Sequence, residues 1–320
     1  MAERLMLLDS ASLYFRAFYG VPDTVKAPDG TPVNAVRGFL DIIAKLVTLY
    51  EPTHLVACWD DDWRPQWRVD LIPSYKAHRV VEVVEVGPDV EEVPDPLVAQ
   101  VPRIREALTA AGIAIVGAAE HEADDVIGTL ATRSTLPVDV VTGDRDLFQL
   151  VDDERDVRIV YTARGMSNLE NVTDAVVLTK YGVHASQYAD FATLRGDTSD
   201  GLPGVPGVGE KSAATLLNAH GDLAGIIAAA EAGTGMSAGI QAKIRASLPY
   251  LEVAPTVVGV VRDLDLDVPD ARIRALDAQE RRDAAALAER GGFGSALARL
   301  LDAFAGVAGI ADETPVLPRE

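Results

Sequence analysis

The segment from Gly196 to Lys211 combines two kinds of chemistry within a short span. Asp197 and Asp200 are three positions apart, so one turn of helix would direct both carboxylates at a single cation. A Pro/Gly hairpin, Gly204 to Gly209, follows directly and leads into a helix that begins at Glu210. Glycines let a backbone approach a ligand closely, and amides at a helix start attract phosphate. The segment therefore predicts an enzyme that cleaves a phosphodiester backbone with the help of metal ions.

Further acidic residues follow four predicted strands, at residues 5–8, 55–59, 113–116 and 138–141. Each run is short and continuously apolar, as is typical of strands buried on both faces. Helical patterns separate the runs, so the alternation predicts an α/β fold with a mostly parallel sheet. The acids that follow the strands are Asp9, Asp60, Glu122, Asp124, Asp125, Asp144 and Asp146.

These acids should meet outside one edge of the sheet, because ligands of open α/β sheets bind at the carboxyl ends of the strands. So many carboxylates would repel one another and raise one another's pKa values unless cations neutralised them. Oxygen ligands without Cys or His suit Mg²⁺ or Mn²⁺ rather than zinc. A single acid after a strand can simply cap a helix. All the groups together, with Asp197 and Asp200, favour a site for divalent metal ions.

A basic segment, Tyr75 to Arg79, lies between the second and third predicted strands. If it is helical, Tyr75, Lys76 and Arg79 share one face, where a ring and two cations suit single-stranded nucleic acid. The alternative is a solvated basic helix with a half-buried tyrosine. The next stretch, Val80 to Pro102, is acidic and contains no Lys or Arg. We expect it to form an exposed, partly mobile loop over the crevice.

Composition limits the class of protein. The 320 residues are 48% hydrophobic and carry a formal net charge of −20, which indicates a globular protein with an acidic surface or an acidic metal site. Cys58 is the only cysteine, so an intrachain disulfide is impossible and a reducing cytoplasm is expected. The apolar run near the start is too short for a secretory signal, and no run is long enough for a membrane span.

Taken in order, these blocks resemble the bacterial 5′–3′ exonuclease and flap endonuclease family, which includes the amino-terminal nuclease domain of DNA polymerase I. The matching stretches lie between Leu8 and Lys211, about two thirds of the chain. They are residues 8–9, 15–18, 34–39, 75–79, 122–128, 142–146 and 196–211. A hairpin motif alone would be a weak signal, whereas the whole set in this order is specific.

The resemblance implies two domains. Residues 1–172 would form a PIN-like nuclease domain with an arch or loop at about 63–102, and residues 173–310 a helix-three-turn-helix DNA-binding domain. We expect residues 311–320 to be disordered. The acidic stretch after Arg79 departs from the more regular helix of the family, which bears on how a 5′ strand is threaded. Because no polymerase domain follows, the chain resembles a separate nuclease, and we expect a monomer.

The resemblance also implies residue roles. One metal group would be Asp9, Asp60, Glu122, Asp124 and Asp125. The second would be Asp144, Asp146, Asp197 and Asp200. The residues that steer the scissile phosphate beneath an arch correspond to Arg16, Tyr75, Lys76 and Arg79. The residues that hold duplex DNA, where relatives bind K⁺ through main-chain oxygens, correspond to Gly204, Val205, Gly207, Val208, Gly209, Lys211 and Ser212.

The expected activity is metal-dependent cleavage of DNA at 5′ flaps, single-strand/duplex junctions and 5′ ends, in replication and repair. Two or more Mg²⁺ or Mn²⁺ ions would activate the attacking water and stabilise the leaving oxygen. Two alternatives stay open: a catalytically weak protein that binds DNA structures, and a PIN-like ribonuclease. The complete set of acids disfavours the first, and the hairpin disfavours the second.

Overall fold

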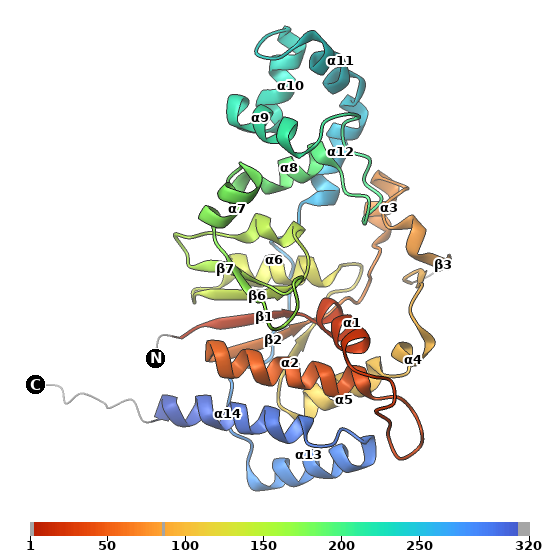
Figure 1. The fold of residues 1–320 in the computed structure, drawn as a ribbon, viewed down its shortest axis with the longest axis vertical. Helices are drawn as coiled ribbons and strands as arrows, with labels where there is room; N and C mark the ends of the chain where they lie inside the picture. Colours follow the sequence, from red (N-terminus) through yellow and green to blue (C-terminus); the bar gives the residue numbers. More distant parts are fainter. Residues whose placement is uncertain (1–2, 85–86, 313–320) are drawn as a thin grey trace, which may run out of the picture.

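The computed structural model describes residues 3–84 and 87–312, which form a six-stranded sheet between helical layers with a helical extension at one end (Figure 1). The strand order is β5-β2-β1-β6-β7-β8, and every neighbouring pair is parallel except β7 and β8. In chain order the strands are β1 (Leu5–Asp9), β2 (His54–Cys58), β5 (Ala114–Val116), β6 (Val138–Thr142), β7 (Val157–Tyr161) and β8 (Glu170–Val172). The four predicted strands are confirmed, whereas β7 and β8 were not predicted.

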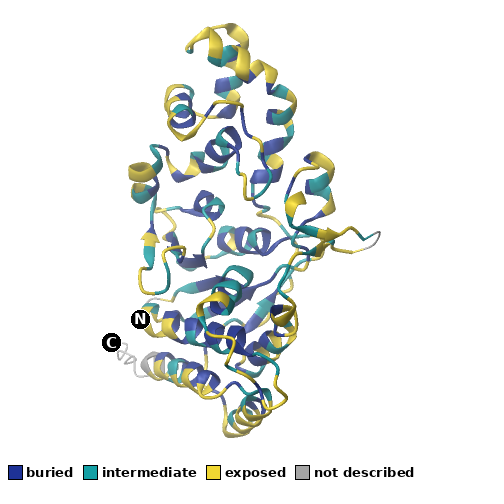
Figure 2. Cartoon of the chain, turned by 45° about the vertical axis from the view of Figure 1, so that its right-hand side comes forward, coloured by how far each residue is buried: buried dark blue, intermediate teal, exposed yellow. Residues whose placement is uncertain are grey.

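The central strand β1 is apolar throughout because both of its faces are covered. Met6 and Leu8 belong to the core under α1 (Ser10–Gly20), α2 (Asn34–Tyr50) and α5 (Val101–Ala110). Leu7 belongs to the opposite core, which contains α6 (Ala123–Arg133) and the helical extension. Burial follows the sheet and the inner faces of the helices, while the outer faces are exposed (Figure 2). This is the two-faced burial that continuous apolar strands predict.

The start of α2 is fixed by Asn34 and by Gln100. Asn34 already lies in the first turn, and its side-chain amide donates to the carbonyls of Phe18 and Val21, at 2.8 and 3.0 Å. The free amide of Ala35 instead donates to Gln100 Oε1 at 2.8 Å. Gln100 is buried and lies far along the chain, so local sequence could not identify it as the partner of this helix end.

The segment between β2 and α5 is irregular. It contains α3 (Gln66–Leu71), a 3₁₀ turn η1 (Ala77–Arg79), a two-stranded ribbon of β3 (Val80–Glu82) and β4 (Val90–Glu91), and α4 (Asp95–Val98). The condition that Tyr75 to Arg79 is helical is not met, because Lys76 has a left-handed backbone with φ of 48° and only Ala77–Arg79 forms a 3₁₀ turn. The expected exposed loop is partly confirmed: Val81 and Val83 are exposed, but Leu97 and Gln100 are buried.

The helical extension begins with α7 (Asp174–Tyr181), which ends at Gly182 in a left-handed conformation. It continues through α8 (Tyr188–Arg195), α9 (Glu210–His220), α10 (Leu223–Ala232), α11 (Ala238–Ala246) and α12 (Leu248–Val258). In Figure 1 these helices occupy the upper end of the molecule. The predicted hairpin lies in the loop between α8 and α9.

The last two helices return to the sheet. The helices α13 (Ala278–Gly291) and α14 (Ala296–Asp312) pack against α5 and α2, at the opposite end of the molecule from α9 to α11 (Figure 1). Leu300 and Phe304 of α14 are buried in the same core as Met6. Residues 278–310 were expected to belong with the helical DNA-binding domain, but they cover α2, whose apolar face would otherwise be open to solvent. Of the predicted disordered tail, 313–320 lie outside the described residues.

Within the part of the chain that the structure describes, no helix has the length and apolarity that crossing a membrane would require.

Candidate active site

The carboxyl ends of the central strands open into a polar crevice of about 590 Å³. Asp9 ends β1, Asp60 lies just beyond β2, and Asp144 lies just beyond β6, and these three strands are adjacent in the sheet. Parallel neighbours deliver their carboxyl ends to one edge, which explains why residues far apart in sequence meet there. The crevice is lined by Asp9, Asp60, Glu122, Asp124, Asp144 and Asp197, together with Lys76 and Arg79.

Asp9 and Asp60 are held by short hydrogen bonds at the strand ends. The hydroxyl of Thr142 donates to Asp9 Oδ2 at 2.6 Å, and the amide of Ala123 donates to Asp60 Oδ1 at 2.8 Å. Burial and then the charge of Asp60 raise the pKa of Asp9 to about 7, and burial raises the pKa of Asp60 to about 6. Asp62 instead accepts a bond from the amide of Arg64. Of the three consecutive aspartates, Asp60, Asp61 and Asp62, it is Asp60 whose charge acts on Asp9.

The start of α6 supplies the next pair of acids. Glu122 precedes the helix and accepts hydrogen bonds from the Tyr75 hydroxyl at 2.7 Å and from Lys76, with which it forms an ion pair. Asp124, in the first turn, is close enough to Asp9 and Asp144 for their charges to act on it. Burial, followed by these two charges, raises the pKa of Asp124 well above its usual value. Asp124 therefore lies between the groups contributed by β1 and β6.

A second acidic group forms where β6 faces the segment after α8. Burial, then the charges of Asp144, Asp200 and Asp197, raise the pKa of Asp146 well above its usual value. Burial also raises the pKa of Asp200, where Asp144 adds to the effect and Lys76 opposes it. Asp144 thus neighbours members of both groups. The two groups and the roles of their residues stay predictions.

Asp197 and Asp200 are not on a helical turn. Residues 197 and 202 exchange two backbone hydrogen bonds, Asp197 N to Leu202 O at 3.0 Å and Leu202 N to Asp197 O at 2.7 Å, so the chain reverses in a tight loop. Gly196 and Gly201 both have positive φ, which favours a loop over a helix here. Asp197 lines the crevice, and Asp200 pairs with Arg79, which also lines it. The two acids therefore lie near each other in a loop and not on a helical turn.

Basic side chains hold several of these carboxylates. Arg79 pairs with Asp200 at 3.0 Å, Arg195 pairs with Asp197 at 3.1 Å, and Lys76 pairs with Glu122. Among the described residues, no three carboxylate, imidazole or thiol groups are already arranged around one point as metal ligands. Lys76, Arg79 and Arg195 provide the positive charge that the acidic groups need. Arg195 was not predicted, because its pairing with Asp197 depends on the conformation of the loop.

Tyr75 does not present its ring to solvent. It is 4% exposed, packs with Ile72 and Leu202, and directs its hydroxyl at Glu122. Burial first, then the charge of Glu122, raises its pKa well above the usual value. The interpretation of Tyr75 as a stacking platform for a nucleobase is therefore wrong. Tyr75 and Lys76 both bind Glu122, whereas Arg79 pairs with Asp200.

Asp125 faces away from the crevice. Its two carboxylate oxygens accept bonds from the Arg68 guanidinium at 2.7 and 2.9 Å, and Oδ1 also accepts the amide of Val261 at 2.9 Å. The residue is fully buried and is not part of the crevice lining. The expectation that Asp125 belongs with the metal-binding acids is not supported by this geometry. Arg68 was missed, because a basic residue in a short helix carries no local sign of a buried partner.

Arg16 lies on α1 next to the end of β6. A Cβ added at Gly143 would lie 3.5 Å from the Arg16 guanidinium, so the two residues are close neighbours. Among the described residues, no hydrogen-bond acceptor lies within reach of its buried Nε atom. The structure therefore places Arg16 beside the strand end that carries Asp144.

The predicted hairpin, Gly204 to Gly209, leads into α9 as expected. Gly204 has φ of 63°, and a Cβ there would lie 2.5 Å from Gly196 N, so the two loop segments cross with no space for a side chain. Val205 and Val208 are buried in the core, so only their main-chain groups can contact a ligand. Gly207, Gly209 and Lys211 are exposed. Ser212, in the first turn of α9, is half-buried.

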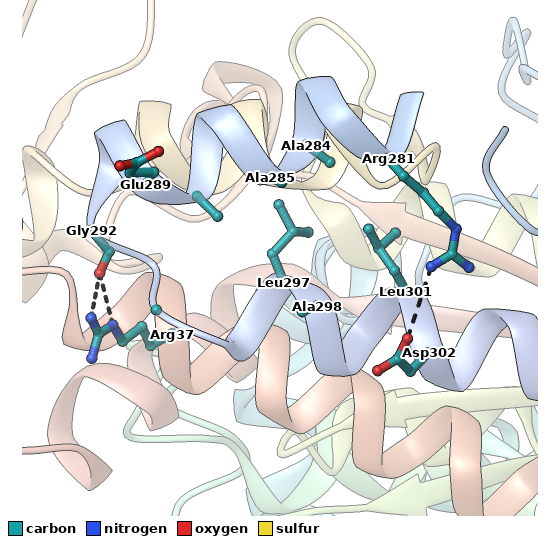
Figure 3. Close-up of a pocket in the computed structure, with 12 residues that line it drawn as sticks. Arg37, Arg281, Ala284, Ala285, Glu289, Gly292, Leu297, Ala298, Leu301 and Asp302 are labelled. Atoms are coloured by element: carbon teal, nitrogen blue, oxygen red, sulfur yellow. Dashed lines mark hydrogen bonds and ion pairs between the residues drawn. The ribbon is translucent and has the colours of Figure 1, made fainter. Parts of the chain in front are cut away.

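A different cavity, of about 450 Å³, lies between α13 and α14 (Figure 3). Ala284, Ala285, Leu297 and Leu301 face it, and charged residues stand only at its ends, where Arg281 pairs with Asp302 at 3.9 Å. The cavity has neither the clustered acids nor the strand ends of the crevice. We therefore assign the chemistry to the crevice.

A mostly parallel α/β sheet with acids at its strand ends, joined to helices that carry a glycine hairpin, defines a PIN-like nuclease. The model of the 5′–3′ exonuclease N-terminal resolvase-like domain matches residues 4–182, and that of the 5′–3′ exonuclease C-terminal SAM fold matches residues 183–281. The chain belongs to the 5′–3′ exonuclease family and is a nuclease.

Its relatives cover nearly the whole chain. A 5′–3′ exonuclease of Streptomyces coelicolor is 60% identical over 92% of this chain and 98% of its own length. A 5′–3′ exonuclease of Mycobacterium tuberculosis is 53% identical over 94% of this chain and 97% of its own length. DNA polymerase I of the same organism is 40% identical, over 83% of this chain but only 28% of the polymerase. The resemblance to both groups is thereby confirmed.

Solved structures share the fold. The T5 D15 protein co-crystallised with metal ions superposes with a TM-score of 0.63 at 16% identity, covering 94% of this chain and 100% of that one. The catalytic core of Rad2 in complex with DNA substrate gives 0.57 at 16% identity, covering 94% and 91%. At this identity the match supports the fold, including a PIN-like sheet with a helical domain.

Proposed function

We propose that this nuclease hydrolyses DNA phosphodiesters at 5′ flaps, single-strand/duplex junctions and 5′ ends, in replication and repair, and that it uses divalent metal ions. One observation carries the proposal. Four carboxylates in or beside the crevice, Asp9, Asp60, Asp124 and Asp146, have no basic partner among the described residues. Buried acids without counter-charges are costly, and bound cations would remove that cost.

The donors fit Mg²⁺ or Mn²⁺, because all of them are carboxylate oxygens. One group would comprise Asp9, Asp60, Glu122 and Asp124. The other would comprise Asp144, Asp146, Asp197 and Asp200, with Asp144 close enough to both groups to be shared. When bound, such ions supply an activated water and charge stabilisation for the leaving oxygen. Asp125 is left out of both groups, because Arg68 occupies its oxygens.

The basic residues of the crevice have a separate task. Lys76 and Arg79 line the same wall as the acids and can offset the negative charge of a scissile phosphate. Arg16, beside Gly143, can do so from the α1 side. Tyr75 takes part indirectly, because its hydroxyl holds Glu122. Without these cations, the carboxylates would repel the phosphate that the enzyme must bind.

Duplex DNA would lie along the helical extension. The exposed glycines at 207 and 209, with Lys211 and Ser212 at the start of α9, can bind backbone phosphates through amides and side chains. Main-chain oxygens of the same hairpin would bind K⁺. Gly204 is required for the crossing of two loop segments, and Val205 and Val208 anchor the hairpin in the core. We expect the enzyme to act as a monomer.

The test uses a labelled DNA with a 5′ flap. Cleavage should require Mg²⁺ or Mn²⁺ and stop with EDTA. Asp124→Asn and Asp146→Asn should each lower the cleavage rate by at least about 100-fold while DNA binding in Ca²⁺ persists. The exposed Asp267→Asn is the matched control and should cleave normally.

Two outcomes would contradict the proposal. Unchanged cleavage in both crevice variants would remove the assigned site. Binding of the flap without any cleavage by the native chain would instead favour a DNA-structure binding protein. A matched RNA flap, cleaved as well as the DNA flap, would favour the ribonuclease alternative.

A further inference from the structure

Arg68 lies at the centre of a buried group of polar residues beneath the crevice. The residue is 2% exposed and sits between the rings of Trp67 and Tyr75, with its guanidinium carbon 4.4 and 5.9 Å from the ring centres. It donates to both oxygens of Asp125 and, at 3.2 Å, to Glu122 Oε1. A planar guanidinium bound in this bidentate way is held in one orientation.

Asp125 and its neighbour Asp124 have opposite environments, although they are adjacent on α6. Asp124 faces Asp9 and Asp144 across the crevice. Asp125 receives Arg68 on both oxygens and the amide of Val261 on one of them, and the amide of Glu122 donates to the other at 3.3 Å. Every carboxylate direction of Asp125 is therefore used inside the protein, and none points to the crevice.

Glu122 connects this buried group to the crevice. Its Oε1 accepts bonds from Arg68 and Tyr75, while Oε2 binds Lys76. The carboxylate thus has fixed donors behind it and a crevice in front of it. Removing Arg68 would leave Glu122 with fewer donors and Asp125 without a counter-charge, in a site that excludes water.

The same buried polar residues also form hydrogen bonds with the segment that leaves the helical extension. Arg68 Nε donates to Val257 O at 3.2 Å, at the end of α12, and Asp125 accepts from Val261 N. Nearby, Gln149 donates to Val258 O at 3.1 Å and accepts from Val260 N at 3.1 Å. We call residues 257–261 the connector. It joins the helices that carry the hairpin to the return segment along β2, and Arg68 contacts both the connector and Glu122.

We infer that Arg68 and Asp125 form a positioning pair that orients Glu122 in the crevice and fastens the connector to it, and that Asp125 is not a metal ligand. The inference rests on the proposed nuclease function. It assigns to Asp125 a role different from that of the acids at the strand ends. It also makes Arg68 the residue that contacts both Glu122 and the connector. Arg68 would thereby hold the helices that carry the hairpin in a fixed position relative to Glu122.

The experiment compares Arg68→Met, Asp125→Asn and the double variant with the native chain. Loss of a residue that orients a metal-binding carboxylate typically costs about 10–100-fold in activity or metal affinity. We therefore expect Arg68→Met to lower the single-turnover cleavage rate by about that factor, with DNA affinity in Ca²⁺ changed less than about threefold. Asp125→Asn keeps one acceptor oxygen and loses the other, so it weakens the bond to Arg68. Because it removes no group from the crevice, it should still lose far less activity than Asp124→Asn.

The double variant distinguishes a pair from two separate roles. Arg68→Met leaves a buried negative charge on Asp125, and adding Asp125→Asn removes that charge. The double variant should therefore be at least as stable and as active as Arg68→Met alone, so the two effects are not additive. Arg68→Lys, which keeps one charge but loses the bidentate geometry, should fall between the native chain and Arg68→Met.

Binding of Mn²⁺, followed by electron paramagnetic resonance, gives a readout besides cleavage. Asp125→Asn should bind as many ions as the native chain, whereas Asp124→Asn should bind fewer. Arg158→Met is the matched control, because Arg158 also pairs with a buried aspartate, Asp139, which keeps Arg4 as a second partner. It should leave ion binding and cleavage unchanged.

Three results would overturn the inference. They are a loss of Mn²⁺ binding in Asp125→Asn equal to that in Asp124→Asn, additive losses in the double variant, and normal cleavage by a folded Arg68→Met. If Arg68→Met does not fold, Arg68→Lys and Asp125→Asn decide the question. If the native chain cleaves no flap, the proposed function fails, while Mn²⁺ binding and thermal unfolding of these variants still test the pair.

Discussion

Thr142 connects the two acidic groups through a single hydroxyl. It donates to Asp9 Oδ2 at 2.6 Å and accepts the amide of Asp144 at 2.9 Å, and the residue is fully buried at the end of β6. A hydroxyl can donate and accept at once, so it fixes a carboxylate of β1 against the turn that carries Asp144. The position of one acidic group relative to the other therefore depends on an uncharged residue.

We expect Thr142→Val to slow cleavage by about 10-fold or more, because Asp9 loses one of its two hydrogen bonds and the Asp144 amide loses its acceptor. Valine has nearly the same shape, so unfolding should become easier by only about 1–3 kcal/mol, the cost of leaving buried polar groups unpaired. Thr142→Ser keeps the hydroxyl and is the matched control. Single-turnover rates and urea unfolding check both effects. Equal rates in the valine and serine variants would show that the hydroxyl is not needed.

At the scale of single residues, the sequence predicted positions better than contacts. Asp9, Asp60 and Asp144 follow strands, so their meeting at one edge could be derived from the fold class alone. The partner of Asp125 could not be, because Arg68 lies 57 positions away and reaches it only through tertiary structure. Arg195 is only two positions from Asp197, but their pairing depends on the conformation of the loop between them. Which neighbouring acid faces the crevice depends on side-chain direction, and spacing does not give that direction.

At the scale of elements, the ribbon of β3 and β4 is the feature that departs most from a nucleic-acid surface. Its described residues and the segment that follows carry Glu82, Glu91, Glu92 and Asp95, and Val80 to Pro102 contains no basic residue. Glu91 reaches the crevice wall beside Arg79. Negative charge at this place repels a single strand that approaches the crevice.

Replacing exposed acids of this ribbon should therefore strengthen binding to single strands. We expect Glu82→Lys with Glu92→Lys to raise affinity for a long 5′ single-stranded flap, with a steeper dependence on salt because more phosphates are neutralised. Glu106→Lys with Glu289→Lys makes the same change of charge on exposed sites of α5 and α13. Fluorescence anisotropy at several salt concentrations compares the two pairs. An equal gain in affinity for both pairs of substitutions would show that net charge, and not the position of the charges, determines binding.

The hairpin before α9 offers a second test at this scale. Gly204 has positive φ and its added Cβ would meet Gly196 N at 2.5 Å, whereas Gly209 has no atom within 4 Å of an added Cβ. We expect Gly204→Ala to lower the free energy of unfolding by about 2 kcal/mol or more, from backbone strain and overpacking together. Gly209→Ala should change it by less than about 1 kcal/mol. Thermal unfolding of both variants measures the difference. Similar losses of stability in the two variants would show that the close crossing of the segments at Gly196 and Gly204 is not the cause.

Elements formed by local patterns were predictable, and those decided by long-range packing were not. The apolar runs of β1, β2, β5 and β6 indicated strands, and Gly182 indicated the end of α7. A turn at Lys76 and a loop at Asp197 stand where helical turns were considered. Lys76 is held by the distant Glu122, and Asp197 exchanges two backbone hydrogen bonds with Leu202. Periodicity predicts a face only after the backbone conformation is settled.

At the scale of the whole molecule, the last helices pack against elements from the first part of the chain. The last helix, α14, packs along α2, so residues near the end of the chain complete the core that starts with β1. The ion pair of Arg299 with Asp41 and the bonds from Arg37 to Gly292 O lie along the same contact. Nothing in the Ala-rich sequence of α13 and α14 indicated which layer they would cover, because their apolar faces fit any apolar partner.

This packing predicts that a core substitution in α14 destabilises the nuclease sheet without altering its chemistry. Leu300 is fully buried between α14 and α2, so Leu300→Ala should lower the free energy of unfolding by about 2–5 kcal/mol. Leu49→Ala, on α2 but 58% exposed, is the matched control and should cost less than about 1 kcal/mol. Urea unfolding measures the stability, and cleavage rates at low temperature should equal the native rate in both variants. Because the crevice lies on the strand ends and not on α14, a slower rate in folded Leu300→Ala would show that the last helix also orients the acids.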